Sequence, residues 1–411
     1  MKKANVNKVL HGMLMLFCIA IVLSLSQGAE AVKFKVNSTD DIVDAAPGDG
    51  ICETASGNNI CTLRAAVQEA NAFAGADEIK LKAATYSLTL TGTGEDLAAT
   101  GDLDITDSVT ITGKGAALTV VDGNHSDRVF QIIGPGPVVN FIGLKVANGS
   151  LGSGDFAGGG IYNSGATVIV NSCTITNNVF YGQIGGGILS TNGNLKVVSS
   201  RVIQNGIFYT GSAAVGGGIA SLLDTSLKII RTKVADNFAA NIADTAATND
   251  IAGGGGIAVE GTNTVKIKSC KIMGNVAYAW TTDLYGASGA GLLMAAVANA
   301  NIIDTKIANN ASSGLQGYGG GVFALSSNAT FSGCAITENS ILGGSGFGGG
   351  MYLKYDGGDP MTITITNQSS VTNNYAFSGG GIYVPPTLIE FFTLNISADS
   401  VVADNLRNDI E

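Results

Sequence analysis

Short segments in which apolar and polar residues alternate run along most of the chain, and glycine triplets separate them. After Gly158-Gly159-Gly160, residues 166–170 alternate and are rich in β-branched side chains, and residues 173–176 form a second such segment after a turn. Asn177-Asn178 closes this unit. Alternation with a period of two, bounded by Gly, Asn and Ser, predicts two short β-strands in the unit.

The unit occurs eight times, at intervals of 27 to 38 residues between the third glycines. From that glycine to the closing Asn, the distance is 18 or 19 residues in the first six copies and 24 in the last two. One arc of each repeat is therefore nearly constant, and an insert of variable length leads to the next glycines. The later glycine elements are residues 185–187, 216–218, 254–256, 289–291, 319–321, 348–350 and 379–381, and the later closing pairs are 204–205, 236–237, 274–275, 309–310, 338–339, 373–374 and 404–405.

A constant arc of short strands with a variable insert predicts an all-β fold, a single-stranded parallel β-helix whose coils stack about 4.8 Å apart. Asn tolerates the left-handed conformation of a sharp corner, and stacked Asn side chains can hydrogen-bond along the stack. Helical repeats fit poorly, because 58 glycines occur among 411 residues and a 3.6-residue period is absent. A propeller blade needs four antiparallel strands, for which the constant arc is short.

The first 31 residues have the features of a signal peptide. Lys2, Lys3 and Lys8 precede the mostly apolar stretch 10–25, and Ala29-Glu30-Ala31 provides a small-x-small cleavage site. The alternatives are a transmembrane anchor, for which the apolar stretch is short, and a lipoprotein site at Cys18, whose neighbours are too large. We therefore expect export by a bacterial-type pathway and cleavage after residue 31.

Residues 32–77 predict an N-terminal cap. Residues 34–37 form a first strand, an acidic loop follows, and residues 63–73 have the pattern of a short amphipathic helix with Thr62 as its N-cap. Such a helix would cover the open end of a solenoid, where core and strand edges are exposed. The β-helix is then expected over residues 78–411, with irregular coils to about residue 150 and regular coils after it.

Three segments of this cap carry a family resemblance. Residues 36–41, 47–54 and 61–72, the last beginning Cys-Thr-Leu-Arg-Ala-Ala, look like the CSLREA domain of exported bacterial proteins. The resemblance implies export and an N-terminal lead-in to a right-handed parallel β-helix. The Gly-Gly-Gly-Ile and Asn-Asn elements within residues 100–405 also resemble the repeats of polymorphic outer membrane proteins. This implies an extracellular location, at the bacterial cell surface or outer membrane, and neither resemblance brings a catalytic motif.

The cysteines fall into two groups. Cys52 and Cys61 flank a short loop, and in an exported protein this favours a disulfide that staples the cap over two buried thiols or metal ligands. Cys173, Cys270 and Cys334 each lie five residues before the last Asn of their coil, where other coils have Ser or Thr. We expect these three to be inward-facing thiols, too far apart for disulfides because they lie in different coils.

Charge and the scarcity of carboxylates narrow the functional classes. The formal net charge of −10 and the absence of an evident basic patch argue against nucleic acid as a partner. Within the coils the carboxylates form no pair or ladder, and His125 lies in an early turn, so no catalytic residue is predicted. The acidic loop residues Asp40, Asp41, Asp44 and Asp49 could bind Ca²⁺ but match no known motif, so no cofactor or metal site is predicted.

Aromatic residues concentrate in the inserts, and stacking of the coils should bring them to one flank. They can pack the inserts against one another or, where they are exposed, contact sugar rings or protein partners. The two longest inserts are adjacent, which makes them the first place to look for a binding site. The candidate ligand-binding residues are Tyr181, Tyr209, Phe238, Tyr278, Trp280, Asp283 and Tyr285.

These observations predict a secreted or cell-surface β-helix protein that acts as an adhesin-like or structural binding scaffold without catalysis. The alternative is a polysaccharide lyase, a glycoside hydrolase or a carbohydrate-binding module on the β-helix flank, because parallel β-helices host such activities and fold does not settle function. The expected partners are extracellular polysaccharides or surface proteins, with peripheral rather than membrane-spanning association.

Overall fold

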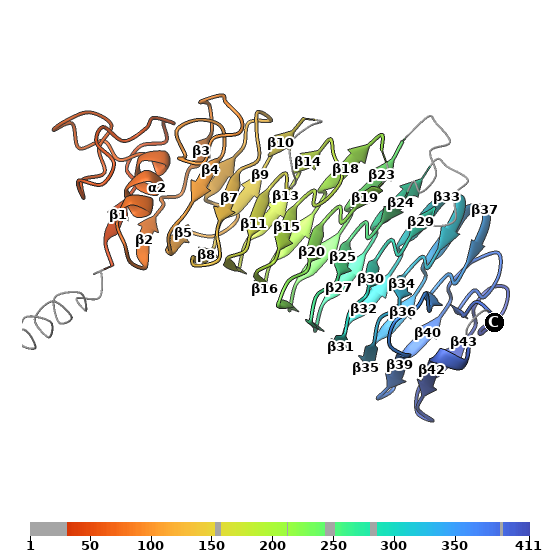
Figure 1. The fold of residues 1–411 in the computed structure, drawn as a ribbon. Coiled ribbons are helices and arrows are strands. Elements are labelled where there is room, and N and C mark those ends of the chain that lie inside the picture. The colour runs from red at the N-terminus through yellow and green to blue at the C-terminus, as the bar shows by residue number, and fades with distance from the viewer. Residues whose placement is uncertain (1–30, 153–157, 212, 243–250, 280–285, 387–388) are drawn as a thin grey trace, which may run out of the picture.

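A computed structural model describes residues 31–152, 158–211, 213–242, 251–279, 286–386 and 389–411. Over these residues the chain winds into a long coil of parallel strands, and one α-helix lies at its N-terminal end (Figure 1). The predicted all-β solenoid with a short N-terminal helix is thus confirmed. Nearly all of the predicted signal peptide, residues 1–31, lies outside the described residues, and it stays a prediction together with the boundaries of the cap and the β-helix.

Sheet A forms one long wall of the coil, with all its neighbouring strands parallel and in register (Figure 1). Its side chains alternate between the core and solvent, as in β16, where Leu195 and Val197 are buried and Lys196 is exposed. The strands of sheet A are β1 (Lys33–Lys35), β2 (Asp77–Lys80), β5 (Val109–Thr112), β8 (Val138–Ile142), β12 (Thr167–Asn171), β16 (Asn194–Val198), β21 (Ser226–Ile230), β26 (Thr264–Lys268), β31 (Asn299–Ile303), β35 (Ala329–Ser332), β39 (Met361–Thr366) and β42 (Phe392–Ile396).

Sheets B and C complete the body of the coil, because each turn passes from C through A to B. Sheet B contains β3 (Thr85–Ser87), β6 (Val120–Asp122), β9 (Lys145–Ala147), β13 (Thr174–Thr176), β17 (Arg201–Ile203), β22 (Lys233–Ala235), β27 (Lys271–Met273), β32 (Lys306–Ala308), β36 (Ala335–Thr337), β40 (Ser370–Thr372) and β43 (Val401–Ala403). Sheet C contains β4 (Leu103–Ile105), β7 (Phe130–Ile133), β11 (Ile161–Ser164), β15 (Ile188–Thr191), β20 (Ile219–Leu222), β25 (Ile257–Glu260), β30 (Leu292–Ala295), β34 (Val322–Leu325), β38 (Met351–Lys354) and β41 (Ile382–Tyr383).

Sheet D is built from the variable inserts between sheets B and C, and it runs along one flank of the coil (Figure 1). The inserts therefore carry a parallel sheet of their own, which the sequence pattern did not predict. Its strands are β10 (Ser150–Leu151), β14 (Val179–Phe180), β18 (Gly206–Tyr209), β19 (Ala213–Val215), β23 (Phe238–Asn241), β24 (Ile251–Gly253), β28 (Val276–Ala279), β29 (Ala287–Ser288), β33 (Ala311–Tyr318) and β37 (Ser340–Phe347). A 3₁₀ turn (η1, Ile389–Phe391) precedes β42.

The core is one continuous column of aliphatic side chains that point inward from sheets A, B and C. Equivalent residues stack from coil to coil, for example Val168 on Leu195 and Leu195 on Leu227. A few aromatic rings also enter this column, as in the contact between Phe130 and Phe141 at 4.7 Å between ring centroids. Burial of β-branched and leucine side chains in this column is the main stabilising contribution to the fold.

The two residues of each closing pair have separate functions. The first takes the left-handed conformation at the corner, as Asn177 and Gln204 do with φ of 56° and 58°. The second is buried, and its amide oxygen accepts hydrogen bonds from the backbone and side-chain nitrogens of the Asn one coil earlier, as Asn205 does from Asn178 at 3.1 and 2.9 Å. The predicted Asn ladder is confirmed, but only the second position forms it.

In the triplet Gly216-Gly217-Gly218, each glycine is needed for a different steric reason. Gly216 has a φ of +77°, which side chains rarely adopt. A Cβ on Gly217 would come within 2.1 Å of the Phe238 carbonyl oxygen, and a Cβ on Gly218 would come within 2.9 Å of the Asn237 side-chain nitrogen. The triplet thus makes room for the insert strand and for the Asn ladder at the same corner.

Cys173, Cys270 and Cys334 are buried, free thiols, as predicted. They belong to a second ladder, in which the hydroxyl one coil later accepts a hydrogen bond from the cysteine N–H: Ser200 for Cys173, Thr305 for Cys270 and Ser369 for Cys334. Burial raises the pKa of the Cys173 thiol to about 11, which keeps it protonated and unreactive.

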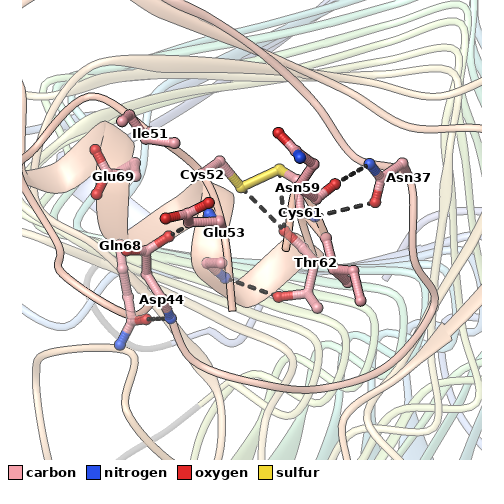
Figure 2. The surroundings of a disulfide bond; sticks show 12 residues. Asn37, Asp44, Ile51, Cys52, Glu53, Asn59, Cys61, Thr62, Gln68 and Glu69 are labelled. Carbon is pink, nitrogen blue, oxygen red and sulfur yellow. Dashed lines mark hydrogen bonds between the residues drawn. A yellow bond between two sulfur atoms is a disulfide. The ribbon is translucent and has the colours of Figure 1, made fainter. Parts of the chain in front are cut away.

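The cap consists of β1, the acidic loop and helix α2 (Leu63–Ala72). Thr62 is the N-cap as predicted, since its hydroxyl accepts a hydrogen bond from the Ala65 N–H. The helix ends one residue earlier than predicted, at Ala72, because Phe73 has extended dihedral angles. The predicted disulfide between Cys52 and Cys61 is present beside the start of the helix (Figure 2).

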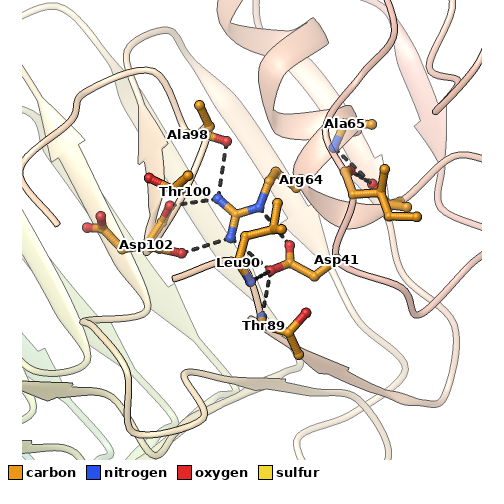
Figure 3. A network of polar contacts seen from close by, with 12 residues as sticks. Asp41, Arg64, Ala65, Thr89, Leu90, Ala98, Thr100 and Asp102 are labelled. Atoms are coloured by element: carbon orange, nitrogen blue, oxygen red, sulfur yellow. Dashed lines mark hydrogen bonds and ion pairs between the residues drawn. The ribbon is translucent and has the colours of Figure 1, made fainter. Parts of the chain in front are cut away.

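Arg64 joins the cap to the first coils (Figure 3). Its Nε and Nη2 donate to the two carboxylate oxygens of Asp41, at 2.6 and 3.1 Å. Its remaining N–H groups donate to the carbonyl oxygens of Ala98, Gly101 and Asp102. All five N–H donors of the guanidinium are therefore used, and the side chain is fully buried.

Candidate ligand-binding groove

Three strands of sheet D bring aromatic side chains of successive inserts together. β14, β18 and β23 pair in parallel register, with Phe180 opposite Ile207 and Ile207 opposite Ala239. Each strand begins directly after a buried Asn of the ladder, which fixes its starting point on the coil. The ladder therefore aligns residues that lie about one repeat apart in the sequence.

The aromatic rings form a stack along this flank. The Tyr181 and Phe208 rings are stacked with centroids 5.9 Å apart, and the Phe208 and Phe238 rings are tilted with centroids 4.6 Å apart. Gly206 lies opposite Phe238, and a Cβ there would come within 2.1 Å of the Phe238 ring. Glycine at this position thus lets the ring lie flat on the backbone of the neighbouring strand.

A groove with a volume of about 680 Å³ opens beside this stack. Its lining is mainly apolar, and half of the Tyr181 surface is exposed to solvent. At its edge the Tyr209 hydroxyl accepts a hydrogen bond from the Gln183 side-chain amide at 3.1 Å. The described residues that line the groove are Gly152, Tyr181, Phe208, Tyr209, Thr210 and Ile242. Apolar ring faces with a few polar groups at the rim are typical of sites that hold sugars or apolar side chains.

The candidate residues named from the sequence have different outcomes. Tyr181 and Tyr209 line the groove, and Phe238 supports the Phe208 ring. Tyr278 lies on β28, in register with Ala240 of β23, and does not line the groove. Trp280, Asp283 and Tyr285 lie outside the described residues. A binding function for any of these positions stays a prediction.

Four lining residues were missing from the sequence-derived set: Gly152, Phe208, Thr210 and Ile242. Phe208 and Tyr209 are adjacent, and their order alone does not show which ring faces the groove. Ile242 is placed beside the groove by the pairing of β18 with β23. Just after β23, the Ile242 N–H donates a hydrogen bond to the Tyr209 carbonyl oxygen at 2.8 Å.

A second aromatic group further along the coil has a structural function. Tyr318 and Phe347 of sheet D stack on each other and contact outward-facing rings of sheet C, including Tyr352. Phe323 and Tyr352 are stacked with centroids 5.4 Å apart and are almost fully buried. Here the alternative interpretation of the aromatic flank is confirmed, because these rings pack the inserts onto the coil.

Buried carboxylates form a separate cluster where the cap meets the first coils. Asp102 pairs with Arg128 at 2.5 Å, and Asp104 accepts a hydrogen bond from the Ala98 N–H at 2.9 Å. Burial and the neighbouring charge of Asp102 raise the pKa of Asp104 to about 8. Because both carboxylates are at most 2% exposed, a polymer cannot reach them. No sequence pattern predicted this cluster, since it depends on the packing of irregular coils.

The raised pKa of Asp104 predicts a specific pH dependence. In the unfolded chain this group ionises near pH 4, whereas in the folded chain it keeps its proton to about pH 8. Its contribution to stability is therefore present below pH 4 and is lost as the pH rises to 8. We expect Asp104→Asn to be more stable than the unmodified chain by a margin that widens over this range in urea unfolding. A constant margin would contradict this.

The acidic loop and His125 show no arrangement for chemistry. Asp41 is paired with Arg64, the Asp44 carboxylate accepts hydrogen bonds from backbone N–H groups of its own loop, and His125 is an exposed turn residue. Among the described residues, no group of three or more His, Cys, Asp or Glu side chains is arranged to hold a metal ion. In the same part of the chain, no helix is both long and apolar enough to cross a bilayer.

The comparison with protein families agrees with this geometry. A family model described as a right handed beta helix region matches residues 233–387, which run from β22 past β41. The chain is thus a right-handed parallel β-helix. No curated protein and no solved structure is significantly similar in sequence. Right-handed β-helices include pectate lyases, glycosidases and adhesin-like proteins, so the fold alone does not decide the activity.

Proposed function

We propose that this chain is an exported, cell-surface binding scaffold of the adhesin type, and that its groove beside Tyr181 binds an extracellular polysaccharide. The observation that carries the proposal is the half-exposed Tyr181 ring, stacked on Phe208 above an apolar groove of about 680 Å³. An exposed aromatic face can stack on the apolar face of a sugar ring, while the hydroxyl of Tyr209 and the amide of Gln183 can bond to sugar hydroxyls.

Export is supported by three independent features. The first 31 residues have a signal-peptide pattern, the cap resembles the CSLREA domain, and the repeats resemble those of polymorphic outer membrane proteins. The Cys52–Cys61 disulfide adds a physical reason, because such bonds persist in oxidising compartments outside the cytosol. A surface location gives a long rigid coil direct access to polymeric ligands.

A scaffold without catalysis fits the groove better than a polysaccharide lyase or hydrolase. Glycoside hydrolysis requires two carboxylates beside the scissile bond. The described residues that line the groove include no carboxylate, and the buried pair Asp102 and Asp104 belongs to the cap junction.

The test is a glycan array followed by titration of each retained oligosaccharide. We expect Tyr181→Ala to weaken binding about tenfold, which corresponds to roughly 1.4 kcal/mol, because it removes the exposed ring of the stack. Phe377→Ala is the matched control, since Phe377 is 58% exposed and lies in another insert. Equal loss in both variants, no retained glycan, or release of shortened products would each overturn the proposal.

A further inference from the structure

Sheet A carries an exposed row of lysines on successive coils. Lys196 of β16 lies opposite Lys228 of β21, and Lys228 lies opposite Lys266 of β26. All three point away from the core and are exposed. Because neighbouring parallel strands are about 4.8 Å apart, the row places one cation on each coil at a regular interval.

Sheet B carries a second row next to the first. Arg201, Lys233, Lys271 and Lys306 are opposite one another on β17, β22, β27 and β32. The two strands of each coil follow each other around a single corner, so both rows belong to the same coils. Arg231 at this corner and Lys268 on β26 extend the same surface. We call the basic face the set Lys196, Arg201, Lys228, Arg231, Lys233, Lys266, Lys268, Lys271 and Lys306.

The basic face is not neutralised by its surroundings. The strands that form it contain no Asp or Glu, and the carboxylate nearest in sequence on this surface, Asp304, lies at the corner before Lys306. No ion pair within the described part of the chain involves any of its nine cations. The face therefore holds nine of the 22 basic residues in a chain with a net charge of −10.

This surface corrects one expectation from the sequence. Net charge suggested that the chain lacks a basic patch, and that premise is wrong, because the register of the coils collects scattered lysines on one side. The exclusion of nucleic acid as a partner stays a prediction, which now rests on the arguments below.

We propose that the basic face binds a linear acidic polysaccharide, one that carries a carboxylate on each sugar. Like charges on opposite residues of neighbouring strands repel, so each row stores unfavourable energy that a polyanion along the row would relieve. A single extended chain of uronic acids presents anions in one line, as the rows present cations. Both rows lie on sheets A and B, whereas the groove beside Tyr181 lies on sheet D, so this inference is independent of the proposed function.

The composition of the face favours a polysaccharide over nucleic acid or lipid. Surfaces for single-stranded nucleic acid combine cations with aromatic side chains on which bases stack, and the strands of the basic face contain no aromatic residue. A long duplex would also bring many phosphates near a protein of net charge −10. Membrane-surface segments often have Trp or Phe anchors beside their cations, and the strands of the basic face contain neither residue.

Oligogalacturonate titration of residues 32–411 tests the proposal, with neutral dextran as the uncharged probe. We expect binding of the oligogalacturonate alone, weakened at least tenfold when salt rises from about 50 to about 300 mM, because counterions compete for the face. The variant Lys196→Gln/Lys228→Gln/Lys266→Gln should lose at least tenfold in affinity at low salt. These lysines are exposed, so the variant should fold as the unmodified chain does.

The matched control removes three exposed lysines outside the face, Lys35→Gln/Lys82→Gln/Lys114→Gln, with the same change in net charge. It should keep its affinity, as should Tyr181→Ala, which separates this site from the groove. Equal weakening in both triple variants, absence of oligogalacturonate binding, or tighter binding to single-stranded DNA or to anionic vesicles would overturn the proposal.

Discussion

Arg64→Leu is expected to destabilise the cap by about 3–5 kcal/mol, because it removes one partner of a buried ion pair and leaves the other charge unpaired. Asp41 is 9% exposed, and its carboxylate would keep only the N–H donors of Thr89 and Leu90. The carbonyl oxygens of Ala98, Gly101 and Asp102 would lose their donors at the same time.

The loss of stability is expected first in the cap and the first coils, and only later in the rest of the coil. A solenoid is stabilised mainly between neighbouring coils, so loosening the cap should expose the first coils while the later ones stay folded. We expect faster amide exchange in α2 and in β2 to β5, and earlier unfolding of this end in urea. Exchange measured by mass spectrometry distinguishes this from uniform destabilisation of the whole coil.

Two further variants show whether the contribution of Arg64 to stability comes from its positive charge or from the geometry of its five N–H donors. Arg64→Lys keeps the charge but has three donors on one nitrogen, so it cannot reproduce the five bonds and should lie between Arg and Leu. Lys33→Ala removes an exposed ion pair with Glu78 at 3.1 Å and should change stability by about 1 kcal/mol or less. If Arg64→Leu changed stability no more than Lys33→Ala does, the cap would not depend on Arg64.

The periodic parts of the fold could be predicted from the sequence because their local causes are visible there. Gly216-Gly217-Gly218 and most of its equivalents mark positions where a Cβ has little room, although Ala290 occupies the middle position of one copy. The Cys52–Cys61 disulfide and the Thr62 N-cap are short-range features, so residue spacing, together with the expected export for the disulfide, favoured them.

Features that depend on register between coils could not be read in the same way. Lys196 and Lys228 are an exception, because each lies nine residues before the last Asn of its coil and the repeat alone aligns them. The pairing of Arg64 with Asp41 requires the loop path of the cap, and the groove requires the alignment of β14, β18 and β23. The variable inserts thus form the candidate groove, and the alignment of their strands could not be predicted from the periodicity of the sequence.

Asn275→Ala is the second change with a large expected effect, about 3–5 kcal/mol, because each buried group left without a hydrogen bond costs roughly 1–3 kcal/mol. The Asn275 side-chain oxygen accepts from the N–H and the side-chain amide of Asn237, at 3.1 and 3.0 Å. Its nitrogen donates to the Val234 carbonyl and to Asn310, at 3.2 and 2.9 Å. Alanine would interrupt this chain of bonds in the middle of the coil.

Asn275→Asp should be at least as damaging, because a carboxylate cannot donate and would place an oxygen against the acceptors of Val234 and Asn310. A carboxylate fits only at the end of the ladder, where Asp409 accepts from the Asn405 N–H and side-chain amide at 3.0 and 3.1 Å and needs no donor of its own. Asp409→Asn should therefore be tolerated.

Asn309→Gly provides the matched control at the equivalent corner of the next coil, where Asn309 precedes the ladder residue Asn310. Asn309 is exposed with a φ of 56°, a conformation that glycine adopts freely. The free energy of unfolding of the Asn309→Gly variant in urea should therefore stay within about 1 kcal/mol of that of the unmodified chain. The first and second positions of the closing pair would then differ by several-fold in their effect, because the first shapes the corner and the second links the coils. Similar losses at Asn275 and Asn309 would show that the hydrogen-bonded ladder is not what holds the stack together.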